Sequence, residues 1–225
     1  MIHVIIPCYL LPDRDNELLH FTKNCIDSLK KNTSQPYRVL IIDNASTVGA
    51  GYLQAVASSS YYIHNDNNLG YAKAVNQGLE ISLKENPDWI VVANNDIEFL
   101  PMWFEYMSMA WDEKTGVVSS HLHENDPSHN AGVEIAHVGL MFGALWLTKP
   151  GIVADVGLLD ESFEFGYYED KDYWQRIAAA GYTMKKAGWC NHIGNATSGK
   201  MENMNQFFFE NKAKYEAKWQ INSGN

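Results

Sequence analysis

Carboxylates stand at two points of the sequence where they could bind a metal ion or move a proton. The first is Asn94-Asn95-Asp96, which directly follows the apolar run at 89–93, so Asp96 is expected at the end of a buried strand. Hard divalent cations prefer such oxygens, and a cation held there can neutralise a diphosphate. The alternative is a strand followed by an Asn/Asp turn without chemical function.

The second point is Glu169-Asp170-Lys171-Asp172, which precedes a helix predicted over 173–180. Acidic residues favour the first turn of a helix because of its dipole, which gives the run a purely structural explanation. The residues around it are aromatic, however. Burial among rings raises the pKa of a carboxyl group, and rings can stack on a sugar face, so the setting suits a general base. The aromatic residues are Phe163, Phe165, Tyr167, Tyr168, Tyr173 and Trp174.

Histidine gives weaker signals. His192 stands alone between Cys190 and Gly194, and such a residue is more often structural than a metal ligand, so Cys190-x-His192 is weak evidence for a zinc site. His121-x-His123 could bind a metal ion from one strand face, but a solvated loop that also holds His129 is the favoured interpretation.

Two phosphate-binding patterns nearly match and are rejected. Gly49-Ala-Gly51 follows a strand only after a gap and has Gln54 where the dinucleotide fingerprint needs its third glycine. Residues 194–200 match the P-loop, but Met201 replaces the Ser or Thr that binds Mg²⁺. Lys200 of this Gly-rich loop could still contact a diphosphate in another fold.

The elements that must position these residues alternate along the first hundred residues. Apolar runs at 4–6, 38–42, 61–63 and 89–93 predict strands, the first closed by Pro7, and helical spacing predicts helices over 18–31 and 71–84. Asn67 or Asn68 is the expected N-cap of the second helix, and Gly70 allows a close backbone approach. This alternation of strands and helices predicts a mostly parallel sheet with helices on both faces.

Ligands of such sheets bind beyond the carboxyl ends of the strands, where Asp43 and Asp96 are expected. Asp43-Asn44-Ala-Ser46 could equally form an Asx turn. The remainder of the chain, from 117, is less regular, with an apolar segment at 138–147 and a terminal helix over 202–219.

Composition narrows the classes of partner. The 225 residues include 17 Lys and Arg against 27 Asp and Glu, a net charge of −10. Such an acidic surface has no general attraction for phosphate backbones, and no nucleic-acid partner is therefore expected. An anionic substrate would need a local positive charge, such as that of a metal ion. Three cysteines do not make a disulfide framework. With no signal peptide or spanning segment recognised, we expect the protein in the cytoplasm or peripherally at a membrane.

Taken together and in order, the motifs resemble those of family 2 glycosyltransferases, and the C-terminal segment resembles rhamnosyltransferase-like members. The resemblance covers residues 2–215. Asn94-Asn95-Asp96 resembles the DXD motif with Asn in its first position, and Tyr168-Glu169-Asp170-x-Asp172 resembles the "ED" motif. The other matching segments are 4–9, 39–46, 68–78, 143–146, 156–163, 173–182 and 207–212.

The resemblance implies a single GT-A domain with a Rossmann-like, mostly parallel sheet flanked by helices. Residues 1–98 would form a nucleotide-binding half, 99–200 a less regular acceptor and catalytic half, and 201–225 a C-terminal helix. That helix could pack on the core, form a homodimer or lie at a membrane, and packing on the core or on a second subunit is favoured.

The implied activity is inverting, metal-dependent transfer from a UDP-, GDP- or dTDP-sugar to a glycan or glycolipid, as in polysaccharide biosynthesis. Asp170 would be the general base and Glu169 would orient the acceptor, while Asp96 and His192 would bind Mn²⁺ or Mg²⁺. The residues expected to contact the donor nucleotide are Pro7, Tyr9, Asp43, Asn68, Gly70, Asn76, Asn94, Asn95 and Lys200.

Two other functions stay open at this point. A nucleotidyltransferase that makes sugar nucleotides would usually need a Gly-rich, basic loop after the first strand, but residues 7–16 contain one Arg and no Gly. A non-catalytic module that binds a sugar or a nucleotide is the other, since a fold does not by itself prove an activity.

Overall fold

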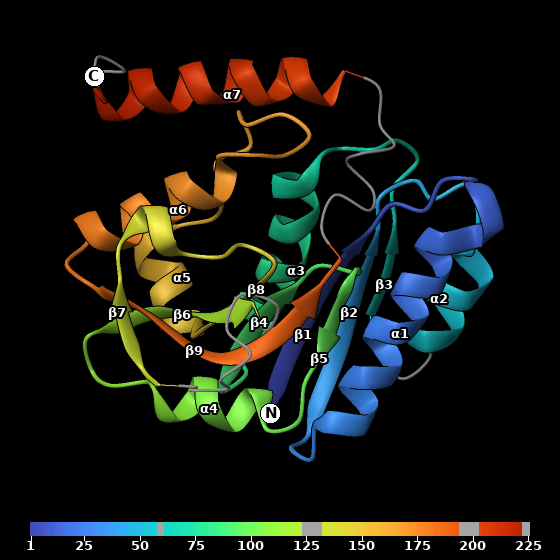
Figure 1. Cartoon of the computed structure of the whole chain (residues 1–225), viewed down its shortest axis with the longest axis horizontal. Helices are drawn as coiled ribbons and strands as arrows, with labels where there is room; N and C mark the ends of the chain where they lie inside the picture. Colours follow the sequence, from blue (N-terminus) through green and yellow to red (C-terminus); the bar gives the residue numbers. More distant parts are fainter. Residues whose placement is uncertain (58–60, 123–131, 194–202, 222–225) are drawn as a thin grey trace.

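A nine-stranded sheet forms the centre of the molecule (Figure 1). The computed structural model describes residues 1–57, 61–122, 132–193 and 203–221. The strand order is β3-β2-β1-β4-β8-β6-β9-β5, with β7 paired to β9. The strands are β1 (Ile2–Cys8), β2 (Tyr37–Asp43), β3 (Tyr61–His64), β4 (Trp89–Ala93), β5 (Ile97–Phe99), β6 (Thr115–Leu122), β7 (Glu134–Ala136), β8 (Leu145–Thr148) and β9 (Thr183–His192).

The first four strands are parallel, as predicted, and the α/β class is confirmed. Beyond β4 the sheet is mixed, because β8 runs antiparallel to both β4 and β6 while β6 and β9 are parallel. β1 also continues past the predicted stop at Pro7. Its pairing with β4 ends at Ile5, so the missing N–H of Pro7 falls where β1 has only β2 as a neighbour.

Helices cover both faces of the sheet. One face packs against α1 (Glu17–Asn32), α2 (Ala50–Val56) and α4 (Trp103–Met109). The other packs against α3 (Tyr71–Glu85), α5 (Pro150–Val156) and α6 (Glu169–Ala179). The buried residues of α3 include Ala72, Val75 and Leu79, spaced to form one apolar stripe. A Cβ at Gly78 would come within 2.5 Å of the Ile5 side chain, so this glycine lets α3 lie close on β1.

The last helix, α7 (Met204–Trp219), lies at the top of Figure 1, above α6. It packs on the core, as favoured from the sequence, through Met204, Asn211 and Tyr215. Near its end, Lys218 forms ion pairs with Asp160 at 2.6 Å and with Asp172 at 2.8 Å. None of the helices in the described ranges is long and apolar enough to cross a membrane.

Several local expectations need correction. The helix predicted over 173–180 begins at Glu169, so the acidic run forms its first turn. His121 lies within β6 rather than in a loop, while His123 and His129 lie outside the described residues. The N-cap of α3 is Gly70, with a φ of +87°, and the amide oxygen of Asn68 accepts a hydrogen bond from the Gly70 N–H instead of capping the helix itself.

Candidate active site

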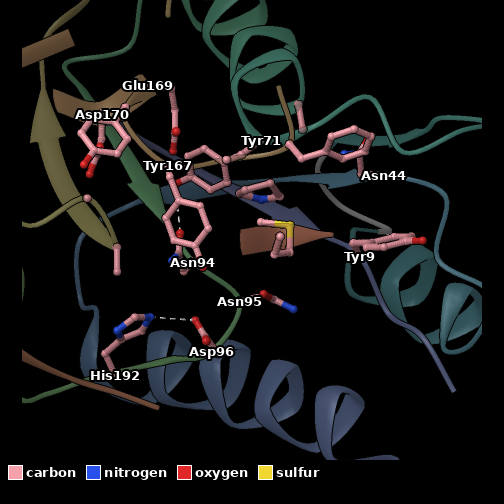
Figure 2. A pocket seen from close by; sticks show the side chains of 18 of the residues that line it. Tyr9, Asn44, Tyr71, Asn94, Asn95, Asp96, Tyr167, Glu169, Asp170 and His192 are labelled. Carbon is pink, nitrogen blue, oxygen red and sulfur yellow. Dashed lines mark hydrogen bonds and ion pairs between the residues drawn. The ribbon is translucent and has the colours of Figure 1, made fainter. Parts of the chain in front are cut away.

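A cavity of about 440 Å³ opens beyond the carboxyl ends of β1 and β4. Figure 2 shows that both predicted groups of chemical residues contribute to it. Glu169 and Asp170 lie in one part, and Asp96 and His192 lie in another. Strands from the first half of the chain and the start of α6 thus meet at one site.

Asp96 and His192 bring two potential metal-binding atoms together in the cavity. The β5–β9 pairing sets Ile97 opposite His192, and this register brings the two side chains together. The carboxylate Oδ1 of Asp96 lies 3.2 Å from Nε2 of His192. Both atoms are buried, and apart from this contact, an ion pair when His192 is protonated, neither has a hydrogen-bond partner among the described residues. An oxygen and an imidazole nitrogen in this arrangement fit a divalent cation, which would satisfy both.

The described residues supply few further ligands. Within the described ranges, no three His, Cys, Asp or Glu side chains are grouped so that they could hold a metal ion. A cation bound by Asp96 and His192 would therefore keep several positions for water or for the oxygens of a ligand. Mn²⁺ or Mg²⁺ bound through few protein groups and a diphosphate fits this description.

Asn94 and Asn95 line the same part of the cavity, and each is fixed by a neighbour. The Tyr71 hydroxyl donates to Oδ1 of Asn94 at 2.9 Å, and Nδ2 of Asn95 donates to the Thr22 hydroxyl at 2.8 Å. Burial, with Glu169 and Asp170 close by, raises the pKa of Tyr71 well above its usual value, so Tyr71 remains a neutral donor. The turn after β4 is thereby held between α1 and α3.

Glu169 and Asp170 are carboxyl groups whose setting favours the protonated form. Burial and the neighbouring Asp170 raise the pKa of Glu169 to about 8. Burial also raises the pKa of Asp170, although the backbone N–H of Lys171 donates to its Oδ1 at 2.7 Å. Oε2 of Glu169 is buried without a partner. A carboxyl group with a raised pKa beside a cavity can exchange a proton with a bound hydroxyl.

The position of Asp170 depends on a glycine from another part of the chain. A Cβ at Gly143, just before β8, would lie 2.5 Å from Oδ2 of Asp170. Any larger residue at 143 would thus displace the carboxylate. Asp172, the third acid of the run, is not part of the cavity lining: it is fully buried and pairs with Arg176 of α6 and Lys218 of α7.

Several predicted donor residues line the cavity. Pro7, Tyr9 and Asn68 do so, together with Asn44, which the sequence motif contained but which was not singled out. Nδ2 of Asn44 donates to Oδ1 of Asn68 at 2.6 Å, linking the loops after β2 and β3. Gly70 stands beside this pair, where a Cβ would come within 2.9 Å of the Phe165 backbone nitrogen. The close backbone approach expected at Gly70 is therefore present.

Besides Gly70, which packs on the Phe165 backbone and is not part of the cavity lining, two of the predicted donor residues lie away from the cavity. Asp43 has no exposed surface, and its carboxylate accepts hydrogen bonds from the Tyr62 hydroxyl at 2.7 Å and the Ser46 N–H at 2.8 Å. Burial acts to raise the pKa of Asp43, but hydrogen bonds from Ser46, Tyr62 and His64 outweigh it and hold the pKa below its usual value. Asp43 thus has a structural role, although its bond reaches three residues ahead to Ser46 rather than the two of an Asx turn, and it shapes the loop carrying Asn44.

Asn76 is the second such residue. Its amide pairs with the backbone of Leu159 in both directions, each bond 2.9 Å long, and also donates to Glu161. It therefore joins α3 to the segment that leads toward α6, instead of reaching the cavity. Lys200 lies outside the described residues.

The sequence did not identify several aromatic and small residues that line the cavity. They are Tyr71, Phe142, Gly143 and, from α7, Phe208. Tyr71 follows Gly70 directly, and that adjacency was the one available signal for it. Nothing local distinguishes Phe208 from Phe207 and Phe209, since only the packing of α7 decides which ring turns inward.

Comparison with known proteins places these features in a family. The model described as Glycosyl transferase family 2 matches residues 3–155. The fold is similar to that of GalNAc-T7 in a crystal structure with UDP, GalNAc and Mn²⁺, with a TM-score of 0.70 and 12% identity over 97% of this chain and 50% of that one. It is also similar to S. aureus TarS, with a TM-score of 0.66 and 12% identity over 100% of this chain and 40% of that one.

TarS 1-349 in complex with UDP-GlcNAc gives a TM-score of 0.66 at 12% identity, over 100% of this chain and 68% of that one. Identities this low establish the GT-A fold and no more. The chain spans half the length of GalNAc-T7 and less than half that of the longer TarS structure. No curated protein sequence matches it significantly. Because the family model matches well over half of its residues, the chain belongs to glycosyl transferase family 2.

Proposed function

We propose that this protein is an inverting glycosyltransferase that moves a sugar from a nucleoside diphosphate to a hydroxyl group of a glycan or glycolipid. One observation carries the proposal. A single cavity is lined by a buried oxygen–nitrogen pair, Asp96 and His192, and by two carboxyl groups with raised pKa values, Glu169 and Asp170. The first pair suits a diphosphate with its cation, and the second suits proton transfer.

The donor would lie across the ends of β1, β2 and β4. Pro7, Tyr9, Asn44 and Asn68 would contact the nucleoside, and Asn94 and Asn95 would stand beside the diphosphate. UDP is the first nucleotide to test, because the solved structures of GalNAc-T7 and TarS 1-349 hold UDP or UDP-GlcNAc. GDP and dTDP are the other two candidates.

Asp96 and His192 would hold Mn²⁺ or Mg²⁺. When bound, the ion would act as a Lewis acid that stabilises negative charge on the departing diphosphate. Asn94 stands where the DXD motif has its first Asp, so the site carries one negative charge fewer than a site with both Asp residues. We therefore expect modest metal affinity in the absence of the nucleotide.

Asp170 would accept the proton of the acceptor hydroxyl. The freed oxygen forms a bond to the anomeric carbon from the face opposite the diphosphate, the bond to the diphosphate breaks, and the configuration inverts. Glu169, with a pKa of about 8, would be largely protonated at neutral pH and could donate a hydrogen bond that orients the acceptor.

Release of nucleoside diphosphate tests the proposal. Wild-type protein incubated with UDP-, GDP- or dTDP-sugars and Mn²⁺ should release one diphosphate, and release should rise when a glycan acceptor is added. Asp170→Asn should abolish release while sparing donor binding, since the amide cannot take a proton. Asp66→Asn, at an exposed position, is the matched control and should behave like wild type. If Asp170→Asn releases diphosphate at the wild-type rate, Asp170 is not the base.

A further inference from the structure

The loop before the proposed base has an unusual backbone. Phe165, Tyr167 and Tyr168 have φ angles of +59°, +70° and +71°, the left-handed region that residues with a Cβ rarely adopt. Such conformations persist only where surrounding contacts impose them, and they occur most often at functional sites. The loop runs directly into Glu169 and Asp170.

Contacts from α7 impose this conformation. Asn211 is 1% exposed, and its Nδ2 donates to the carbonyls of Glu164 at 2.9 Å and of Gly166 at 2.8 Å. The Phe207 ring packs on Phe165, with centroids 4.4 Å apart. The backbone N–H of Tyr71, at the start of α3, also donates to the Phe165 carbonyl at 3.3 Å. The loop is therefore held from two sides.

Tyr167 projects into the cavity as a result. Figure 2 shows its ring between the Glu169–Asp170 side and Asn94. Phe208 meets the Tyr167 ring edge-on, with centroids 5.4 Å apart and planes at 79°, and also packs against Tyr168 at 5.5 Å. The hydroxyl of Tyr167 has no hydrogen bond among those described, so its contribution to the cavity is the ring face.

Only some of the aromatic residues that surround Glu169 and Asp170 in the sequence can contact a ligand. Phe163, Tyr173 and Trp174 are buried in the core. Phe165, Tyr167 and Tyr168 line the cavity, joined by Phe208 of α7. A ring face with carboxyl groups at its edge matches a pyranose, which has an apolar C–H face and polar hydroxyls around its rim.

We propose that Tyr167 is the platform on which the pyranose ring of the acceptor stacks, in a subsite that α7 completes with Phe208. The inference rests on the proposed function, since it assigns an acceptor to the same cavity. The acceptor is favoured over the donor sugar because Tyr167 precedes Asp170 by three residues and shares the loop that positions this base. The acceptor is then a glycoside that presents a sugar ring, rather than a hydroxyl on a bare alkyl chain.

Saturation-transfer NMR on the full chain tests the proposal. The probes are methyl α- and β-pyranosides of glucose, galactose, mannose, rhamnose and N-acetylglucosamine, each with UDP and Mn²⁺ present. At least one should receive saturation at its ring C–H protons in wild type. Tyr167→Leu, which keeps apolar bulk without a ring face, should weaken its binding roughly tenfold, and Tyr167→Phe should bind like wild type.

Tyr106→Leu is the matched control, because Tyr106 lies on α4, is 38% exposed and does not line the cavity. It should leave glycoside binding unchanged. The proposal is overturned if Tyr167→Leu binds the glycosides as well as wild type does, if it weakens UDP binding instead, or if no glycoside binds wild type. UDP binding in the same samples tests the proposed function separately. If wild type does not bind UDP, the proposed function is contradicted. If wild type binds UDP but Tyr167→Leu does not change glycoside binding, only the stacking platform is contradicted.

Discussion

At the scale of single residues, the proposed mechanism gives two neighbouring carboxyl groups different roles. Asp170 must be ionised to accept a proton, and Glu169 must be protonated to donate a hydrogen bond. Burial raises the pKa of both, and that of Glu169 reaches about 8.

These pKa shifts predict a bell-shaped dependence of kcat/KM on pH. Activity should fall toward low pH as Asp170 gains a proton, at a pH above the usual range of an aspartate, because its pKa is raised. Activity should fall again as pH rises through about 8, because Glu169 then loses its proton. Glu169→Gln keeps a hydrogen-bond donor that cannot ionise, so it should remove the alkaline limb. A profile of Glu169→Gln identical to that of wild type would contradict this role.

Gly143 lies against the proposed base, Asp170, and so affects the position of its carboxylate. Gly143→Ala would bring a methyl group within 2.5 Å of Oδ2 of Asp170 and force the carboxylate to move. A displacement of the proposed base by about 1 Å should lower kcat by roughly 100-fold. UDP affinity, measured by calorimetry, should stay within about twofold of wild type.

Gly151→Ala is the control for that substitution, since nothing lies within 4 Å of a Cβ placed at Gly151. It should leave kcat unchanged. Equal activities of Gly143→Ala and Gly151→Ala would show that the closeness of position 143 to Asp170 has no catalytic consequence.

At the scale of elements, α7 lies beyond the segment that the family model matches, which ends at residue 155, as α6 and β9 also do. Asn211→Ala removes both hydrogen bonds to the loop before α6 and should cost about 1–3 kcal/mol of folding stability. The amides of residues 164–168 should exchange with solvent faster, and kcat should fall while UDP affinity holds.

Asn205→Ala, on the exposed side of the same helix, should change none of these properties. Asn211→Ala could instead lose stability uniformly, so that amides 164–168 exchange no faster than in wild type when compared with the rest of the chain. That result would argue against specific stabilisation of the loop by Asn211.

The first half of the fold follows from the sequence because its elements are periodic. The strand at 89–93 is predicted with its observed bounds, since a continuous apolar run marks a strand buried on both faces. β9 escapes prediction because Lys185, Lys186 and Gly188 interrupt its pattern. Its register with β5 is what brings His192 to Asp96, so this pair could be expected only from the family resemblance.

The site was only partly predictable for a similar reason. Sequence spacing shows that Asp43 and Asn76 are polar residues near strand ends and helix starts, but not which way their side chains turn. In the structure both are satisfied by the protein itself, Asp43 by Tyr62 and Ser46, and Asn76 by the backbone of Leu159. Asn68 and Asp96 carry the same kind of signal and do line the cavity.

At the scale of the whole molecule, the net charge of −10 opposes the binding of an anionic donor. Asp96 and Asp170 also line the cavity, although Lys171 lines it as well. In the proposed function, a bound cation would supply the attraction for the diphosphate. Nucleotide binding should accordingly depend on a divalent metal ion and on Asp96.

Isothermal titration calorimetry of UDP into the wild-type chain tests this requirement most directly, in Mn²⁺ and again after its removal with EDTA. We predict binding in Mn²⁺ that is lost in EDTA and in Asp96→Ala, with Asp66→Ala as a control that binds like wild type. GDP and dTDP, titrated in the same way, identify the base if UDP is not the one bound. UDP binding of equal strength with and without Mn²⁺ and in Asp96→Ala, or no binding of any of the three nucleotides to folded protein, would contradict the account.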